Sequence, residues 1–107
     1  MIGSEGQIQW ARQIQATIGP EFDRVAAAFR EVADRQQGLD RRDTLAIIAI
    51  LEEKRGEVLA NEHAGYFVHD WQELHDQVRQ LLLKDSRYLT IQGERQARKR
   101  IQKEATC

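Results

Sequence analysis

Apolar residues recur every three or four positions from Ile8 to Ile18, which is the period of an amphipathic helix. We therefore predict a first helix from about Glu5 to Ile18. Ser4, followed three residues later by Gln7, has the spacing of a capping box, in which each side chain accepts a hydrogen bond from the other residue's backbone N–H. The helix should begin directly after Ser4.

The dipeptide Gly19-Pro20 interrupts this pattern. We expect it to end the first helix, because glycine tolerates the left-handed cap conformation and proline suits the first turn of a following helix. A second helix is predicted from Glu21 to about Gln37, where the apolar stripe is most regular: Phe22, Val25, Ala26, Phe29, Val32 and Ala33.

The seven apolar residues from Leu45 to Leu51 fit a buried strand as well as a helix. The run continues into a segment rich in helix formers, so we predict a third helix over about 41–63 that is apolar on all sides in its first half. Packing in the core of one chain explains this run. Four short helices cover it only in part, however, and the second hypothesis is a homodimer that buries Leu45, Ile47, Ile48, Ile50 and Leu51.

A fourth helix is predicted from Trp71 to about Lys84, after the separating sequence GYFV. We expect a break near Asp85-Ser86. Residues 86–93 are then either a turn with a short extended piece or more helix, and the segment from Glu94 is helical in composition. The predicted fold is all-α: one domain over 1–107, a small antiparallel bundle of four main helices with a basic C-terminal segment over about 94–107.

Composition agrees with a folded domain. The chain has 107 residues, of which 41% are hydrophobic and 31% charged, with one proline. No apolar run approaches the roughly 20 residues of a membrane-spanning helix. The N-terminus has no secretory signal, and the single cysteine, Cys107, has no partner for an internal disulfide. We therefore expect a cytoplasmic protein without a membrane segment.

Charge is unevenly distributed along the chain. Residues 1–76 carry eight Arg or Lys against fourteen Asp or Glu, whereas residues 77–107 carry eight against three. In a helical C-terminal segment, four cations form one stripe that could bind a row of phosphates: Arg95, Arg98, Lys99 and Lys103. Two other interpretations stay open. In the first, the cations lie on a solvated helix face that carries Glu94–Arg98 and Arg100–Glu104 ion pairs. In the second, they dock on the acidic middle of a second copy of the chain.

Other functional patterns are weak or absent. The helix predicted after the Gly38 turn presents the apolar run from Leu45 to Leu51, which argues against a recognition helix that would read DNA bases. His69, Glu73 and Asp76 would share one face of the fourth helix, but their spacing matches no known metal motif, so we expect a solvated face and no metal. No nucleophile or phosphate-loop motif occurs, and we predict no catalytic residues and no cofactor.

The sequence therefore favours a non-catalytic helical interaction or regulatory protein, homodimeric, that presents a helical face to a protein partner. The alternative is a nucleic-acid-associated protein that binds phosphates through Arg95, Arg98, Lys99 and Lys103. A metal-binding helical protein is the third hypothesis.

Overall fold

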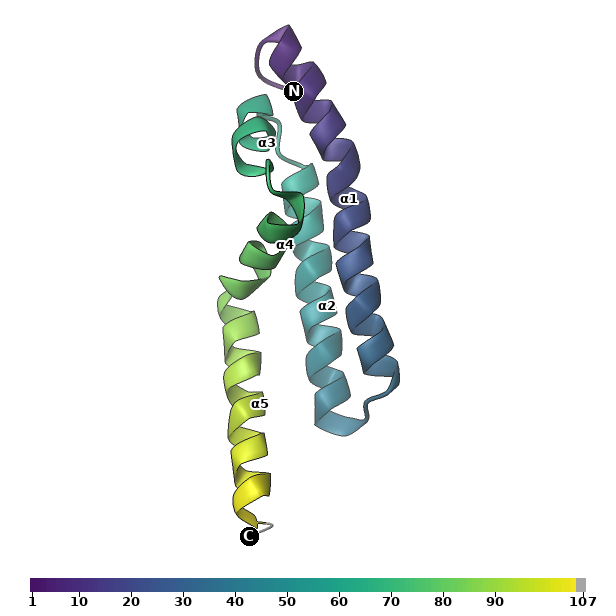
Figure 1. Ribbon diagram of the computed structural model, residues 1–107, viewed down its shortest axis with the longest axis vertical. Helices are drawn as coiled ribbons and strands as arrows, with labels where there is room; N and C mark the ends of the chain where they lie inside the picture. Colours follow the sequence, from purple (N-terminus) through teal and green to yellow (C-terminus); the bar gives the residue numbers. More distant parts are fainter. Residues whose placement is uncertain (106–107) are drawn as a thin grey trace.

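The computed structural model describes the backbone of residues 1–105 and the side chains of residues 1–102. Within that part, five helices follow one another along the chain: α1 (Glu5–Asp34), α2 (Gly38–Leu59), α3 (Ala64–Asp70), α4 (Leu74–Leu83) and α5 (Ser86–Ala105) (Figure 1). The described residues form no strand, only an isolated bridge between Ile2 and His63. The predicted all-α bundle is confirmed.

The helix α1 runs through Gly19-Pro20, so the predicted break there is wrong. Ile18 and Phe22 are both buried and lie one turn apart, so the two predicted stripes form one face that packs on α2. Pro20 lies on the exposed side of α1, where the carbonyl that loses its helical partner can be hydrated. Gly19 has a packing role: a Cβ at this position would lie 3.0 Å from Nη2 of Arg55.

The start of α1 is as predicted. The Ser4 hydroxyl accepts a hydrogen bond from the backbone N–H of Gln7, and the Gln7 side chain accepts one from the N–H of Ser4, each at 3.2 Å. The backbone of Ile2 then binds the α2–α3 connection, since its N–H donates to the Glu62 carbonyl at 2.5 Å and its carbonyl accepts from Ala64 at 2.8 Å. The N-terminus is thereby fixed beside the far end of α2.

The helices α1 and α2 form a long antiparallel hairpin. Gly38 reverses the chain with a φ of 63°, a conformation that favours glycine. Arg41 closes the turn, because its side chain donates to the Ala33 carbonyl at 3.0 Å. The interior of the hairpin is mainly apolar, and its largest fully buried apolar side chains are Ile18, Phe22, Ile47 and Leu51.

The predicted fourth helix, Trp71 to about Lys84, is present in shortened form as α4, and a further helix, α3, precedes it. The GYFV sequence, predicted to separate the third and fourth helices, is itself part of α3. Trp71 caps the end of α3, and α4 begins at Leu74. The break places the Trp71 ring in the core, with its centroid 6.1 Å from that of Phe22. The break predicted near Asp85 is present, but residues 86–93 are helical, so the extended alternative is wrong.

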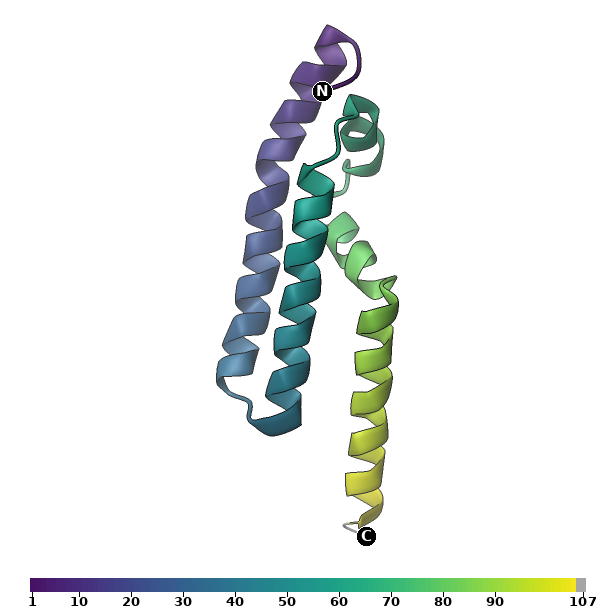
Figure 2. The ribbon, with the colours of Figure 1, turned by 180° about the vertical axis from the view of Figure 1, so that it is seen from behind.

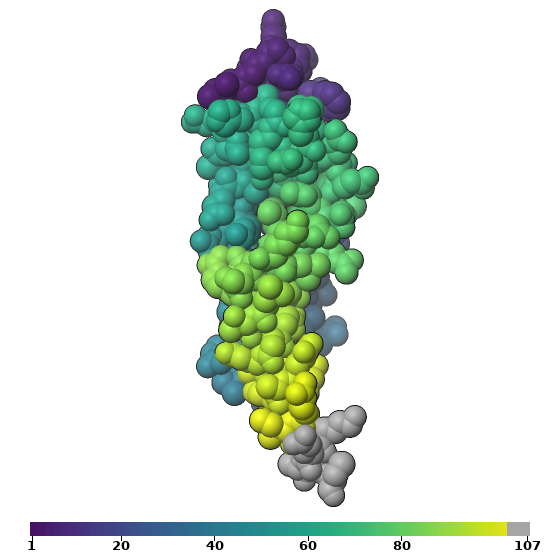
Figure 3. All heavy atoms as spheres, turned by 90° about the vertical axis from the view of Figure 1, so that its left-hand side faces the viewer, coloured from purple at the N-terminus to yellow at the C-terminus, as the bar shows by residue number. Residues whose placement is uncertain are grey.

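The last three helices cover one side of the hairpin. The helices α3 and α4 pack on α1, and α5 then runs antiparallel to α2 with little contact to α1 (Figure 1). Seen from behind, the hairpin has no helix over it (Figure 2). The side view shows α3, α4 and α5 arranged end to end along the molecule, which measures 64 × 22 × 18 Å (Figure 3). No described helix combines the length and the apolar character that a membrane crossing requires.

The two tryptophans provide a test of this core. Trp71 is 2% exposed and Trp10 is 55% exposed. We predict that Trp71→Ala lowers the free energy of unfolding by about 3–5 kcal/mol, because it leaves a cavity against Phe22. Trp10→Ala should change it by about 0.5 kcal/mol or less. Urea unfolding followed by circular dichroism measures both, and equal losses would contradict the packing of Trp71.

Candidate interaction site

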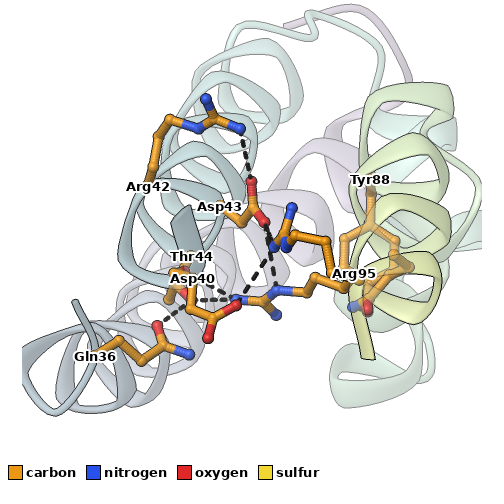
Figure 4. A network of polar contacts seen from close by, with 9 residues as sticks. Gln36, Asp40, Arg42, Asp43, Thr44, Tyr88 and Arg95 are labelled. Atoms are coloured by element: carbon orange, nitrogen blue, oxygen red, sulfur yellow. Dashed lines mark hydrogen bonds and ion pairs between the residues drawn. The ribbon is translucent and has the colours of Figure 1, made fainter. Parts of the chain in front are cut away.

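A polar cluster joins the C-terminal helix α5 to the start of α2. We call it the α2–α5 polar cluster; it consists of Asp40, Asp43, Thr44, Arg95 and Arg98. Arg98 donates to the buried carboxylate of Asp43 and lies 3.3 Å from the Asp40 carboxylate. Arg95 donates to the Thr44 hydroxyl at 2.6 Å and to the Asp40 carbonyl at 3.1 Å (Figure 4). The Asp43 carboxylate raises the pKa of Arg98 above its usual value.

The positions on each helix explain this cluster. Asp43 and Thr44 follow Asp40 by three and four residues and lie on its side of α2, and Arg95 and Arg98, three residues apart, share one face of α5. The Thr44 hydroxyl also donates to Gln36 at 2.5 Å, which extends the cluster to the α1–α2 turn (Figure 4). A buried carboxylate such as Asp43 is stable only with charged partners, and Arg98 is the closest of them.

A second set of ion pairs holds the beginning of α5. The Asp85 carboxylate accepts hydrogen bonds from the backbone N–H of Arg87 at 2.9 Å and from its guanidinium at 3.0–3.1 Å. Lys54 of α2 lies 3.3 Å from the same carboxylate, and Arg87 also reaches Glu53 at 2.5 Å. The Arg87 guanidinium holds the pKa of Asp85 far below its usual range. Polar contacts therefore attach α5 to α2 at two places along its length.

The four cations of the predicted phosphate-binding stripe are not equivalent. Arg95 and Arg98 face α2, with side chains 18% and 27% exposed, and their nearest anions belong to the same chain. Lys99 is exposed, and the side chain of Lys103 lies outside the described residues. Arg98 pairs with Asp43 instead of the predicted Glu94. The predicted Arg100–Glu104 pair involves the side chain of Glu104, which lies outside the described residues.

An apolar groove lies between α1 and α4. We call it the α1–α4 groove; its volume is about 480 Å³, and Tyr88 of α5 also lines it. Its apolar lining comes from all three helices: Val25, Phe29, Val78, Leu82, Leu83 and Tyr88. Arg24, His75 and Arg79 complete the lining, which contains no acidic residue. The groove thus combines an apolar floor with basic side chains on both α1 and α4.

A buried carboxylate supports the basic side of the groove. Glu21, 5% exposed, accepts hydrogen bonds from Arg24 at 2.5 and 3.1 Å, and His75 Nδ1 lies 2.7 Å from it. The Arg24 guanidinium, with a smaller effect from His75, lowers the pKa of Glu21 to about 2 although burial opposes this. Arg24 and His75 remain largely exposed, so Arg24 still offers outward N–H groups, and His75 offers one through Nε2 when its ring is protonated.

The predicted dimer interface is largely interior to one chain. Ile47, Ile48, Ile50 and Leu51 are buried, because α1 and the α4–α5 segment pack on different sides of α2. Leu45 is 38% exposed. Homodimerisation through these residues is not tested by their burial and stays a prediction.

The weak metal candidates are distributed over two helices. His69 lies in the last turn of α3, Glu73 precedes α4, and Asp76 lies in its first turn, so the expected common helical face does not form. Among the described residues, no three His, Cys, Asp or Glu side chains are grouped as a metal site would require.

Sequence reasoning did not identify the α1–α4 groove, because its lining is spread from Arg24 to Tyr88. One signal was available. The stripe from Phe22 to Ala33 is wider than one neighbouring helix covers, and Val25 and Phe29 accordingly remain half-buried. Comparison with protein-family models, with curated proteins and with solved structures finds no match to this chain.

The Glu21 carboxylate gives a prediction for pH. Its pKa falls from 4.5 in the unfolded chain to about 2 in the fold, so its contribution to stability is complete above pH 4.5 and is lost as the pH falls toward 2. Glu21→Gln should therefore lower the free energy of unfolding at pH 7 by on the order of 2 kcal/mol, and by much less near pH 2.5. Urea unfolding at both pH values measures this difference, and a loss independent of pH would contradict the role of the charge.

The α2–α5 polar cluster makes a second prediction. Asp43→Asn removes a charge-assisted hydrogen bond to Arg98, so amide hydrogen exchange over 92–102 should accelerate about tenfold or more. Exchange in the α1–α2 core should change little. Asp34→Asn is the matched control, because no ion pair within the described residues involves Asp34. Unchanged exchange in the Asp43 variant would show that α5 is held in another way.

Proposed function

We propose that this chain is a non-catalytic helical interaction protein that binds a helix of a partner protein in the α1–α4 groove. The observation that supports this most is the groove itself, with six apolar lining residues and three basic ones. Amphipathic helices bind such grooves by inserting apolar side chains spaced three or four residues apart. Desolvation of these side chains supplies affinity, and the charged rim sets orientation.

The dimensions of the groove limit its occupant. Its wall on α4 extends from His75 to Leu83, which corresponds to a rise of about 12 Å or roughly two helical turns. A volume of about 480 Å³ lies within the range of roughly 300–1,000 Å³ that is usual for binding clefts. We therefore expect two or three apolar side chains of the partner to enter the groove.

The other functional hypotheses have less support. A homodimer through the Leu45–Leu51 run would have to use residues that are mostly buried in one chain. Nucleic-acid binding by the predicted stripe would have to compete with Asp40 and Asp43 for two of its four cations. The cytoplasmic location stays part of the proposal, supported by the single cysteine in the sequence.

A helical-peptide display library selected on the full chain tests the proposal. Peptides selected on the wild type should bind Leu83→Arg at least tenfold more weakly, because the variant places a charge in the groove lining. Leu89→Arg is the matched control, since Leu89 is exposed on α5 outside the groove. Circular dichroism checks that both variants fold. Selection of no peptide, or equal losses in the two variants, would contradict groove binding.

A further inference from the structure

We infer that the helix bound in the α1–α4 groove is acidic, with Asp or Glu on both sides of its apolar anchors. This inference rests on the proposed function and specifies the chemistry of the partner. The groove floor is apolar, and every charged or titratable group in its lining, apart from the Tyr88 phenol, is basic. Arg24 belongs to the α1 wall, whereas His75 and Arg79 belong to the α4 wall. An occupying helix thus meets basic groups on both flanks.

These basic groups have N–H donors available for a ligand. Arg79 makes no ion pair or hydrogen bond through its side chain with any described residue, and it is exposed. Arg24 uses Nε and Nη2 toward Glu21, which leaves Nη1. His75 donates through Nδ1 to Glu21, so its Nε2 is a further donor only when the ring is protonated. A carboxylate on either flank of the bound helix can therefore accept a charge-assisted hydrogen bond.

Glu21 contacts two of the groove-lining residues, Arg24 and His75, and its charge reduces the positive potential without reversing it. Its carboxylate is buried behind Arg24 and His75 and does not line the groove. Two arginines against one glutamate leave one net positive charge in this cluster, and a protonated His75 adds a second. The field at the groove mouth therefore favours an anionic segment.

The uncovered side of the hairpin has the opposite character. A shallow hollow of about 370 Å³ lies between α1 and α2 on a different face of α1. Its charged residues are four acids against two arginines: Asp23, Glu31, Asp34 and Glu52 with Arg30 and Arg55. Both arginines already pair with acids of this set, at 3.7 Å and 3.1 Å. An acidic helix is thus attracted to one side of the hairpin and repelled by the other.

Helix geometry specifies the sequence pattern of the partner. Two apolar anchors at i and i+4 lie one turn apart and fit the two-turn groove. Positions i+1 and i+3 lie on opposite sides of that apolar stripe, so acids at these positions face the two walls. The expected motif is an apolar residue, an acid, any residue, an acid and a second apolar residue.

Two labelled synthetic helices test the inference directly. Both carry Leu at i and i+4 on an Ala-rich background; one has Glu and the other Lys at i+1 and i+3. By fluorescence anisotropy with the full chain, the Glu helix should bind at least tenfold more tightly than the Lys helix. The preference should shrink when the salt concentration rises from about 50 to about 300 mM, because exposed charges are screened.

Charge reversal in the protein provides the second part of the test. Arg79→Glu should abolish or invert the preference for the Glu helix, because Arg79 lines the groove without supporting any described contact. Arg100→Glu, an exposed charge on α5 outside the groove, is the matched control and should leave the preference unchanged.

The possible outcomes separate this inference from the proposed function. Equal binding of the Glu and Lys helices, lost in Leu83→Arg, would retain the groove and overturn the acidic partner. Binding of neither helix, or binding insensitive to Leu83→Arg, would overturn the proposed function as well. A preference that disappears in Arg100→Glu but survives in Arg79→Glu would overturn the inference by placing the contact on α5. Self-association that displaces the Glu helix would identify a second copy as the occupant, which also overturns it.

Discussion

The structure depends on the need to cover the apolar run of residues 45–51 in the middle of α2. Ile50 and Leu51 follow Ile47 by three and four residues and share its face of α2, whereas Ile48 lies about 100° further round the helix axis and needs a second cover. The chain buries them with α1 on one side and the α4–α5 segment on another. The long α1 and the break at Trp71, which turns the chain back over the hairpin, both serve this covering.

The two sides of α2 are covered by different physical means. Helix α1 and α4 contribute large apolar side chains, whereas α5 beyond Ile91 contributes mainly Arg95 and Arg98 to carboxylates of α2. Helix α5 packs along α2 and not along α1. The apolar surface of α1 around Val25 and Phe29 is therefore covered by α4 on one side only. The groove is therefore a direct consequence of how α2 is covered. Its basic rim consists of Arg24 and His75, which hold the buried Glu21 carboxylate, and of Arg79, which pairs with no described residue.

Local patterns predicted the helices well where periodicity and packing agree, as in the capping box at Ser4 and the stripe from Phe22 to Ala33. They failed at Gly19-Pro20, where burial of Ile18 and Phe22 on one face outweighs the local tendency to end a helix. The cations of α5 were recognised from the sequence. Their partner Asp43 was not, because it lies 55 residues before Arg98 in the chain. The groove needed the positions of three helices, which no local pattern contains.

Methyl NMR during titration with the acidic helix would test the central role of the groove most directly, because it reports on each apolar side chain separately. The groove assignment predicts shifts for methyl groups of Val25, Val78, Leu82 and Leu83, with Leu39 and Leu45 on the exposed side of α2 unaffected. Shifts centred on Leu39 and Leu45 would contradict it, and would place the interaction surface on α2.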